Sequence, residues 1–119
     1  MRADFDLVPT IRARRRRDTY ERLREALLSL AGGRATIVRH TAKAWASVTF
    51  EGARHTLELE FTGAAAVAAG ERLIAELPEH EFAIPGELVA DASVIAADHT
   101  LLSAPRLAVT CELLVLRDA

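Results

Sequence analysis

Hydrophobic residues recur along this chain with two periods, and each period predicts one kind of element. Between Asp18 and Gly32-Gly33 they recur every three or four residues, which predicts a helix with one buried side. Asp18 and Glu21 have the spacing of a capping box at its start, and the two glycines would end it. A second stripe, made mostly of alanine and leucine, predicts another helix from Ala64 to Leu77, ended by Pro78.

The segment between the two expected helices alternates between apolar and polar residues, and we expect a three-stranded antiparallel meander there. Residues 36–40 would form its first strand and residues 41–43 a connection. Gly52-Ala53 fits the centre of a type II′ turn, in which glycine takes the first central position. Counting outward from that turn places Phe50 opposite His55 and separates an apolar face from a polar one.

Two more strands are predicted after the second helix. Residues 87–95 alternate, residues 96–105 form a connection, and residues 107–116 have the clearest strand pattern in the chain. The order of elements therefore predicts an α+β fold: helix, three-stranded antiparallel meander, helix and two further antiparallel strands, with the helices packed on one sheet face. Residues 1–17 are expected to be an N-terminal lead-in, and residues 18–119 a single α+β domain.

Composition narrows the class of protein. The chain has 119 residues, of which 50% are hydrophobic and 27% charged, and this excludes an intrinsically disordered protein. No segment reaches the ~20 apolar residues of a membrane-spanning helix, and Asp4 and Asp6 stand where a signal peptide would be apolar. We therefore expect a cytoplasmic protein with no membrane partner. The single cysteine, Cys111, allows no disulfide within the chain, and its apolar strand pattern predicts a buried thiol.

Charge is distributed unevenly along the sequence. Residues 1–60 have a net charge of +4 and residues 61–119 a net charge of −6, and the run Arg14-Arg15-Arg16-Arg17 precedes the first helix. Four guanidinium groups could contact phosphates. The whole chain is acidic, however, and the run has neither interleaved aromatic residues nor a nucleic-acid-binding motif, so we do not expect nucleic-acid binding. We favour a solvated basic face, or one that pairs with the acidic half of another subunit.

Histidines and aspartates offer a second kind of site. His40 and His55 lie on neighbouring expected strands, and Asp98 and His99 lie in the connection before the last strand. Asp91 interrupts a largely apolar strand. If these side chains met, they could serve acid–base chemistry or bind a metal or small ligand. No His-x-x-x-His pair, Gly-rich phosphate loop or Gly-x-Ser-x-Gly motif occurs, so we assign no catalytic residue, metal or cofactor.

A tryptophan on a polar strand face is the strongest candidate for an interaction. In the expected hairpin Trp45 shares its face with Glu58 and Glu60. The last strand is apolar on both faces, because Leu114 and Leu116 accompany its core residues. Such a surface needs cover. A second copy of the chain is the simplest cover, and the N-terminal segment folding over the sheet is the alternative.

These patterns favour one function over two alternatives. We expect a non-enzymatic binding or assembly module that acts as a homodimer through its sheet face and docks a protein partner. One alternative is an enzyme that uses the histidines and aspartates, which requires that they converge within hydrogen-bonding distance. The other is phosphate or nucleic-acid binding through the arginine run.

Overall fold

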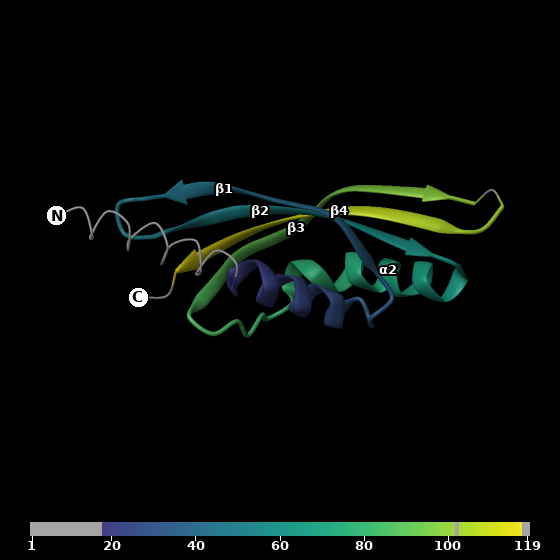
Figure 1. Cartoon of the computed structure of the whole chain (residues 1–119), viewed down its shortest axis with the longest axis horizontal. Helices are drawn as coiled ribbons and strands as arrows, with labels where there is room; N and C mark the ends of the chain where they lie inside the picture. The colour runs from purple at the N-terminus through teal and green to yellow at the C-terminus, as the bar shows by residue number, and fades with distance from the viewer. Residues whose placement is uncertain (1–17, 102, 118–119) are drawn as a thin grey trace, which may run out of the picture.

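The computed structural model describes residues 18–101 and 103–117. Residues 18–30 are helical, and the further elements in chain order are β1 (Thr36–Ala46), β2 (Glu51–Thr62), α2 (Ala64–Glu76), the 3-10 turn η1 (Leu77–Glu79), β3 (Glu87–Thr100) and β4 (Arg106–Arg117). The four strands form one antiparallel sheet in the order β1-β2-β4-β3. The first helix and α2 lie against the same face of that sheet (Figure 1). The fold is therefore α+β, with one sheet layer and one helical layer.

The expected three-stranded meander is wrong, because the first strand does not end where the pattern suggested. β1 continues through residues 41–43, and its hairpin to β2 turns at residues 47–50 rather than at Gly52-Ala53. In this turn the Ser47 amide donates to the Phe50 carbonyl oxygen (2.7 Å), and the Phe50 amide donates to Ser47 Oγ (3.1 Å). Phe50 consequently lies in the turn and has no partner residue in β2.

Gly52 has a different role from the one predicted. It lies inside β2, opposite Trp45 of β1 and Leu116 of β4. A Cβ atom at Gly52 would collide with the Val115 carbonyl oxygen and would lie 2.8 Å from Leu116 Cα. Glycine is therefore required because β4 approaches its backbone closely, and not because a turn needs a positive φ.

The last two strands are also longer and less regular than the alternation predicted. β3 continues to Thr100, so only residues 101–105 connect it to β4. Its pairing with β4 is interrupted by bulges at Ala90 and Ile95. Each bulge adds one residue and reverses the alternation of side chains after it. The β3 side chains that pack against the core are consequently Val89, Ala92 and Val94. The sheet is thus built from two long hairpins, β1–β2 and β3–β4, with four strands instead of five.

The core lies between the sheet and the two helices. The buried side chains on this inner face of the sheet are His55, Leu57, Leu59 and Phe61 of β2 and Leu107, Val109, Cys111, Leu113 and Val115 of β4. Leu23 and Leu27 of the first helix and Leu73 of α2 are fully buried against them. Gly70 lets α2 approach the sheet closely, since a Cβ atom there would lie 2.9 Å from the Phe61 ring.

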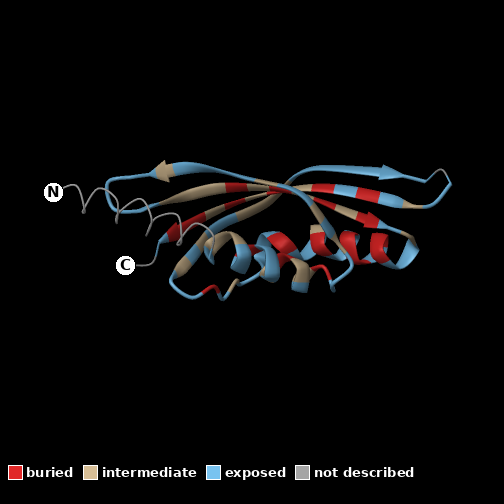
Figure 2. Ribbon diagram, viewed as in Figure 1, coloured by how far each residue is buried: buried red, intermediate tan, exposed pale blue. Residues whose placement is uncertain are grey.

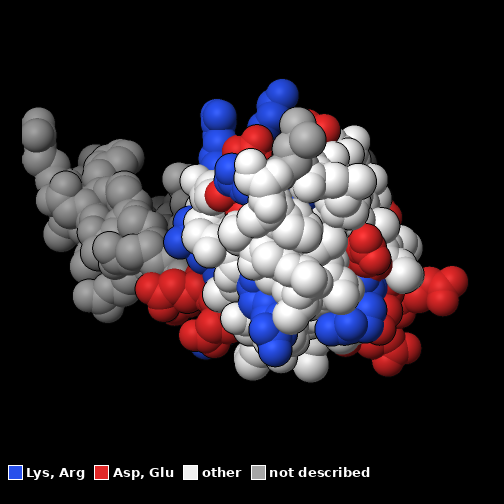
Figure 3. Space-filling model, turned by 90° about the vertical axis from the view of Figure 1, so that its right-hand side faces the viewer, with Lys and Arg blue, Asp and Glu red and all other residues white. Residues whose placement is uncertain are grey.

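The helices cover only the middle of the sheet. The structure extends 60 × 25 × 20 Å, and the hairpins project beyond the helical layer at both ends (Figure 1). Buried residues concentrate in the middle of the molecule and the hairpin ends are exposed (Figure 2). Seen from the β3–β4 end, charged side chains lie mostly around the rim, and the middle of this end is largely uncharged (Figure 3). Leu101 in the β3–β4 turn is 74% exposed.

Both expected helices are confirmed, although one expected cap is not. Asp18 is itself helical, so it does not act as the predicted N-cap. Gly32 and Gly33 have positive φ, and the Gly33 amide donates to the Leu28 carbonyl oxygen (2.8 Å), which ends the first helix as predicted. α2 ends at Glu76, and the 3-10 turn η1 follows it directly.

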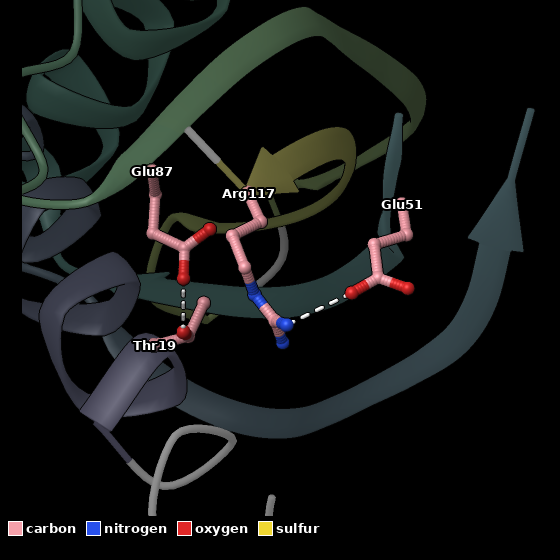
Figure 4. Close-up of polar contacts among 4 residues, drawn as sticks. All are labelled: Thr19, Glu51, Glu87 and Arg117. Carbon is pink, nitrogen blue, oxygen red and sulfur yellow. Dashed lines mark hydrogen bonds and ion pairs between the residues drawn. The ribbon is translucent and has the colours of Figure 1, made fainter. Parts of the chain in front are cut away.

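Polar contacts attach the first helix to the sheet at its N-terminal end. Thr19 Oγ1 donates to Glu87 Oε1 of β3 (2.8 Å), and beside this contact Arg117 of β4 donates to Glu51 of β2 (2.8 Å) (Figure 4). The Arg117 guanidinium lies between the two carboxylates in this view. The first contact joins the helix to β3, and the second joins β4 to β2 at the same end of the core.

Candidate functional site

The sheet face opposite the helices is covered by no described element (Figure 1). We call it the outer face. Its residues, from the register of the strands, are Thr36, Arg39, Thr41, Lys43 and Trp45 of β1; Gly52, Arg54, Thr56, Glu58, Glu60 and Thr62 of β2; Arg106, Ala108, Thr110, Glu112, Leu114 and Leu116 of β4; and Leu88, Asp91, Ser93, Ala96, Asp98 and Thr100 of β3. All of these except Leu116 are half-buried or exposed. The five predicted interaction residues are all on this face.

Three of those five residues lie near one another. Trp45 is opposite Gly52, Gly52 is opposite Leu116, and Leu116 is opposite Leu88, so one row of residues crosses all four strands. Leu114 is the next residue of β4 on the same face. Trp45 and Leu114 are half-buried, Leu88 is 50% exposed and Leu116 is 6% exposed. We call Trp45, Leu88, Leu114 and Leu116 the apolar patch.

Glu58 and Glu60, the other two predicted interaction residues, lie far from Trp45. They share its face, but they are six and eight residues along β2 from its partner Gly52. At about 3.3 Å per residue this separation is about 20 Å or more. The predicted grouping depended on the wrong hairpin register. Glu60 instead accepts a hydrogen bond from Arg106 of β4 (3.0 Å).

Cross-strand ion pairs lie on the rest of the outer face. Arg54 of β2 pairs with Glu112 of β4 at 3.1 Å, and Arg106 of β4 pairs with Glu60 of β2 at 3.0 Å. Their side chains are 30–55% exposed, so each pair is expected to contribute less than about 1 kcal/mol. The first pair lies beside the apolar patch, because Arg54 is opposite Leu114, and the second lies at the end of the sheet nearer to the β3–β4 turn.

His40 and His55, which the sequence placed only on neighbouring strands, are in contact on the inner face. His40 Nε2 is 2.8 Å from His55 Nδ1. Arg24 of the first helix donates from Nε to His40 Nδ1 (3.0 Å), and the Tyr20 ring stacks on His40 with centroids 4.0 Å apart. We call these four residues the histidine cluster. It joins the first helix to the β1–β2 hairpin.

The geometry assigns the protons of this cluster. A guanidinium group only donates, so His40 Nδ1 accepts, and the His40 proton lies on Nε2 and is donated to His55 Nδ1. Burial, and then the charges of His55 and Arg24, lower the pKa of His40 to about 4. Burial lowers the pKa of His55 to about 4. Both rings are therefore neutral at pH 7, and this arrangement packs a helix on a hairpin rather than holding a base poised near neutral pH.

The aspartates and the third histidine of the predicted site lie elsewhere. Asp91, Asp98 and His99 belong to β3, at the opposite edge of the sheet from β1. Asp91 and Asp98 are on the outer face, whereas the histidine cluster is on the inner face. Within the described residues, no three His, Cys, Asp or Glu side chains form a group that could hold a metal ion. Of the five residues, the structure brings together His40 and His55.

Three further predictions concern neither the outer face nor the histidine cluster. Arg14–Arg17 lie outside the described residues. Cys111 is confirmed as a buried thiol, and burial raises its pKa to about 12. None of the helices in the described part of the chain is long and apolar enough to cross a membrane.

Sequence reasoning missed Arg24 and Tyr20 as partners of the histidines. Their spacing of four residues places both on one side of the first helix, and that spacing was the available signal. It does not show which strand lies beneath that side, because the approach of β1 depends on the whole sheet.

Comparison with known proteins identifies the fold but not a family. No protein-family model matches this chain, and no curated protein matches its sequence significantly. Among solved structures, the fold is similar to that of a chain in the virion of a native gene transfer agent particle. The TM-score is 0.57 at 16% sequence identity, and the match covers 82% of this chain and 90% of that chain. At this identity the similarity shows a shared fold alone.

Proposed function

We propose that this protein is an assembly subunit that binds a second copy of itself through the outer face of its sheet. The apolar patch carries the proposal, because it gathers Trp45 and three leucines on a face that no described element covers. Apolar patches rimmed by polar residues mark interaction sites, and tryptophan is enriched among the residues that dominate binding.

A second copy fits this patch for a geometric reason. A two-fold axis parallel to the strands, passing between β2 and β4, would set Trp45 against the partner's Leu88. The same axis would set Leu116 over the partner's Gly52, where no side chain stands. The two apolar patches would then lie face to face, as in a self-complementary two-fold interface. The simplest such assembly is a homodimer.

The structural comparison supports an assembly role in general terms. The similar chain is a component of a virion, which is a particle built from many subunits. The proposed role uses no metal or cofactor and no chemistry from the histidine cluster. A cytoplasmic location remains our prediction.

The test is the oligomeric state, measured by sedimentation velocity over a wide range of protein concentration. We expect the wild-type protein to self-associate, and Trp45→Ser and Leu88→Ser each to weaken association by about tenfold or more, since truncation of a central interface residue costs over ~1.4 kcal/mol. Far-UV circular dichroism checks that both variants are folded.

Leu101→Ser is the matched control, because Leu101 is an exposed leucine at the other end of the sheet. It should leave association unchanged. A wild-type protein that stays monomeric throughout, or association that is as tight in both patch variants as in the wild type, would contradict the proposal. Retention of a different protein by a monomeric wild type would assign the patch to a heterologous partner instead.

A further inference from the structure

The two edges of the sheet carry charges of opposite sign. β1 forms one edge and β3 the other. β1 contains Arg39 and Lys43 and no acidic residue, whereas β3 contains Glu87, Asp91 and Asp98 and neither lysine nor arginine. Except for Glu87, these residues are exposed and belong to the outer face. Within the described residues, none of those four exposed charges takes part in an ion pair.

Both edges also offer backbone groups for pairing. Neither strand contains proline, so every residue along each edge has an amide N–H as well as a carbonyl group. Residues 39–46 of β1 and 96–100 of β3 are free of bulges, and each stretch is as long as a short natural strand. Regular edge segments of this kind are templates for the addition of a further strand.

Strand direction allows a second copy to continue the sheet. Three antiparallel pairings separate β1 from β3, so these two strands run in opposite directions. A copy placed alongside in the same orientation would bring its β1 antiparallel to β3 of the first copy. The hydrogen-bonding pattern would then stay antiparallel across the boundary.

Charge selects this arrangement over the symmetric ones. Pairing β1 with the partner's β1 would set Arg39 and Lys43 beside their own copies, and pairing β3 with β3 would do the same for Asp91 and Asp98. Like charges across adjacent strands are destabilising, whereas opposite charges are favourable. Pairing of β1 with β3 is the arrangement that joins opposite signs.

We infer that copies of this chain join head to tail, with β1 of one copy pairing with β3 of the next. The inference rests on the proposed function and adds a second contact to the one across the outer face. Because each copy retains one free basic edge and one free acidic edge, the contact continues into a ring or an open chain, according to the rotation between copies. A lysine such as Lys43 ordinarily protects an edge, and here its charge favours pairing with an edge of the opposite sign. The bulges at Ala90 and Ile95 limit the length of β3 that can pair regularly.

Two charge-reversal variants test this contact. Arg39→Glu with Lys43→Glu makes both edges acidic, and Asp91→Lys with Asp98→Lys makes both edges basic. We expect each variant alone to lose the head-to-tail contact, seen by sedimentation velocity as association weakened by at least about tenfold. An equimolar mixture should recover it, because every β1 then meets a β3 of opposite charge. Native mass spectrometry of the mixture should show the two variants in equal numbers.

Controls carry the same changes of net charge away from the edges. Arg34→Glu with Arg72→Glu matches the first variant, and Glu71→Lys with Glu76→Lys matches the second; all four residues are exposed outside the sheet. Both controls should assemble as the wild type does. Edge variants that assemble like the wild type, or a mixture that does not recover association, would overturn the inference and leave the proposed function standing. A monomeric wild type would overturn both.

Discussion

Individual residues set how closely the elements of this protein approach one another. Gly52 lets β4 lie against β2 at a distance that any side chain would prevent. The His40–His55 pair fills the space between the first helix and the β1–β2 hairpin, and each ring is held in one tautomer by the donation from Arg24. A larger side chain at position 52 would therefore collide with β4, and a second proton on either histidine would break the hydrogen bonds that the neutral rings make.

Gly52→Ala should destabilise the protein by about 1–3 kcal/mol, the usual cost of forcing additional bulk into a closely packed site. The added methyl group would meet backbone atoms of β4, which cannot rotate away as a side chain can. Urea denaturation measures the free energy of unfolding. The control is Ala44→Ser, at an exposed position of β1, which should change that free energy by less than about 0.5 kcal/mol. Equal losses in both variants would argue against close approach at Gly52.

The histidine pair should make the protein sensitive to acid. The pKa of each ring is about 4 in the folded protein and 6.5 in the unfolded chain, so the unfolded chain binds more protons between these values. Stability is therefore complete above about pH 6.5 and is lost as the pH falls toward 4. For buried His55 alone the loss is on the order of 3 kcal/mol, at ~1.4 kcal/mol per pH unit.

Urea denaturation at several pH values between about 7 and about 4, a range that includes both pKa values, would measure this loss. His55→Leu should reduce the dependence on pH, whereas His99→Gln, at an exposed position of β3, should retain the wild-type dependence. A pH dependence that is the same in His55→Leu and in the wild type would show that the pair is not responsible.

At the scale of elements, bulges decide which side of β3 faces the core. The bulge at Ala90 places Val89 and Ala92 on the inner face, three residues apart, where strict alternation would have set them on opposite faces. Leu88 is then directed to the outer face and is 50% exposed. The face of a strand can therefore change along its length although the sequence pattern remains strand-like.

This arrangement predicts that truncating the smaller side chain, Val89, destabilises the protein more than truncating the larger one, Leu88. Val89→Ala should destabilise the protein by about 1–2 kcal/mol, from the loss of two partly buried methyl groups, whereas Leu88→Ala should cost about 0.5 kcal/mol or less. Denaturant titration at a protein concentration too low for self-association measures both values. A larger loss for the leucine would contradict the positions of the bulges.

At the scale of the whole molecule, the sheet is longer than the helices that cover it. A strand of 14 residues spans about 46 Å at ~3.3 Å per residue, whereas a helix of 13 residues spans about 20 Å at ~1.5 Å per residue. Two helices therefore cover the middle of one face and leave the hairpin ends, the outer face and both edges available. The surface offered to other molecules is in this way a direct result of the unequal length of the elements.

Contact between edges of opposite charge should depend on salt. Raising the NaCl concentration from about 0.1 to 1 M shortens the Debye length from about 10 to about 3 Å, which screens Arg39 and Lys43 from Asp91 and Asp98. Association of the wild type should weaken several-fold, as measured by sedimentation velocity. In the variant Arg39→Glu with Lys43→Glu, whose edges are both acidic, the remaining association through the apolar patch should be unaffected or strengthened by salt. Wild-type association that tightens with salt would assign it to the apolar patch alone.

Features that depend on near neighbours along the chain can be predicted from the sequence. Both helices, the glycine stop after the first of them, the last strand and the buried Cys111 follow from periodicity and from local backbone preferences. The presence of Trp45 and of two leucines on one face of the sheet was also predicted, because side chains alternate within any regular strand.

Which of these residues meet depends on how the strands pair in the folded protein. Gly52 has the character of a turn residue, but in the structure it lies within β2, where β4 approaches its backbone closely. The hairpin turns at residues 47–50 instead, and Trp45 therefore lies far from Glu58 and Glu60. The contact between His40 and His55, the bulges in β3 and the separation of charge to opposite edges likewise depend on strand order. The physical reason is that strands pair across long stretches of sequence, so a strand's own pattern specifies its faces but not its neighbours.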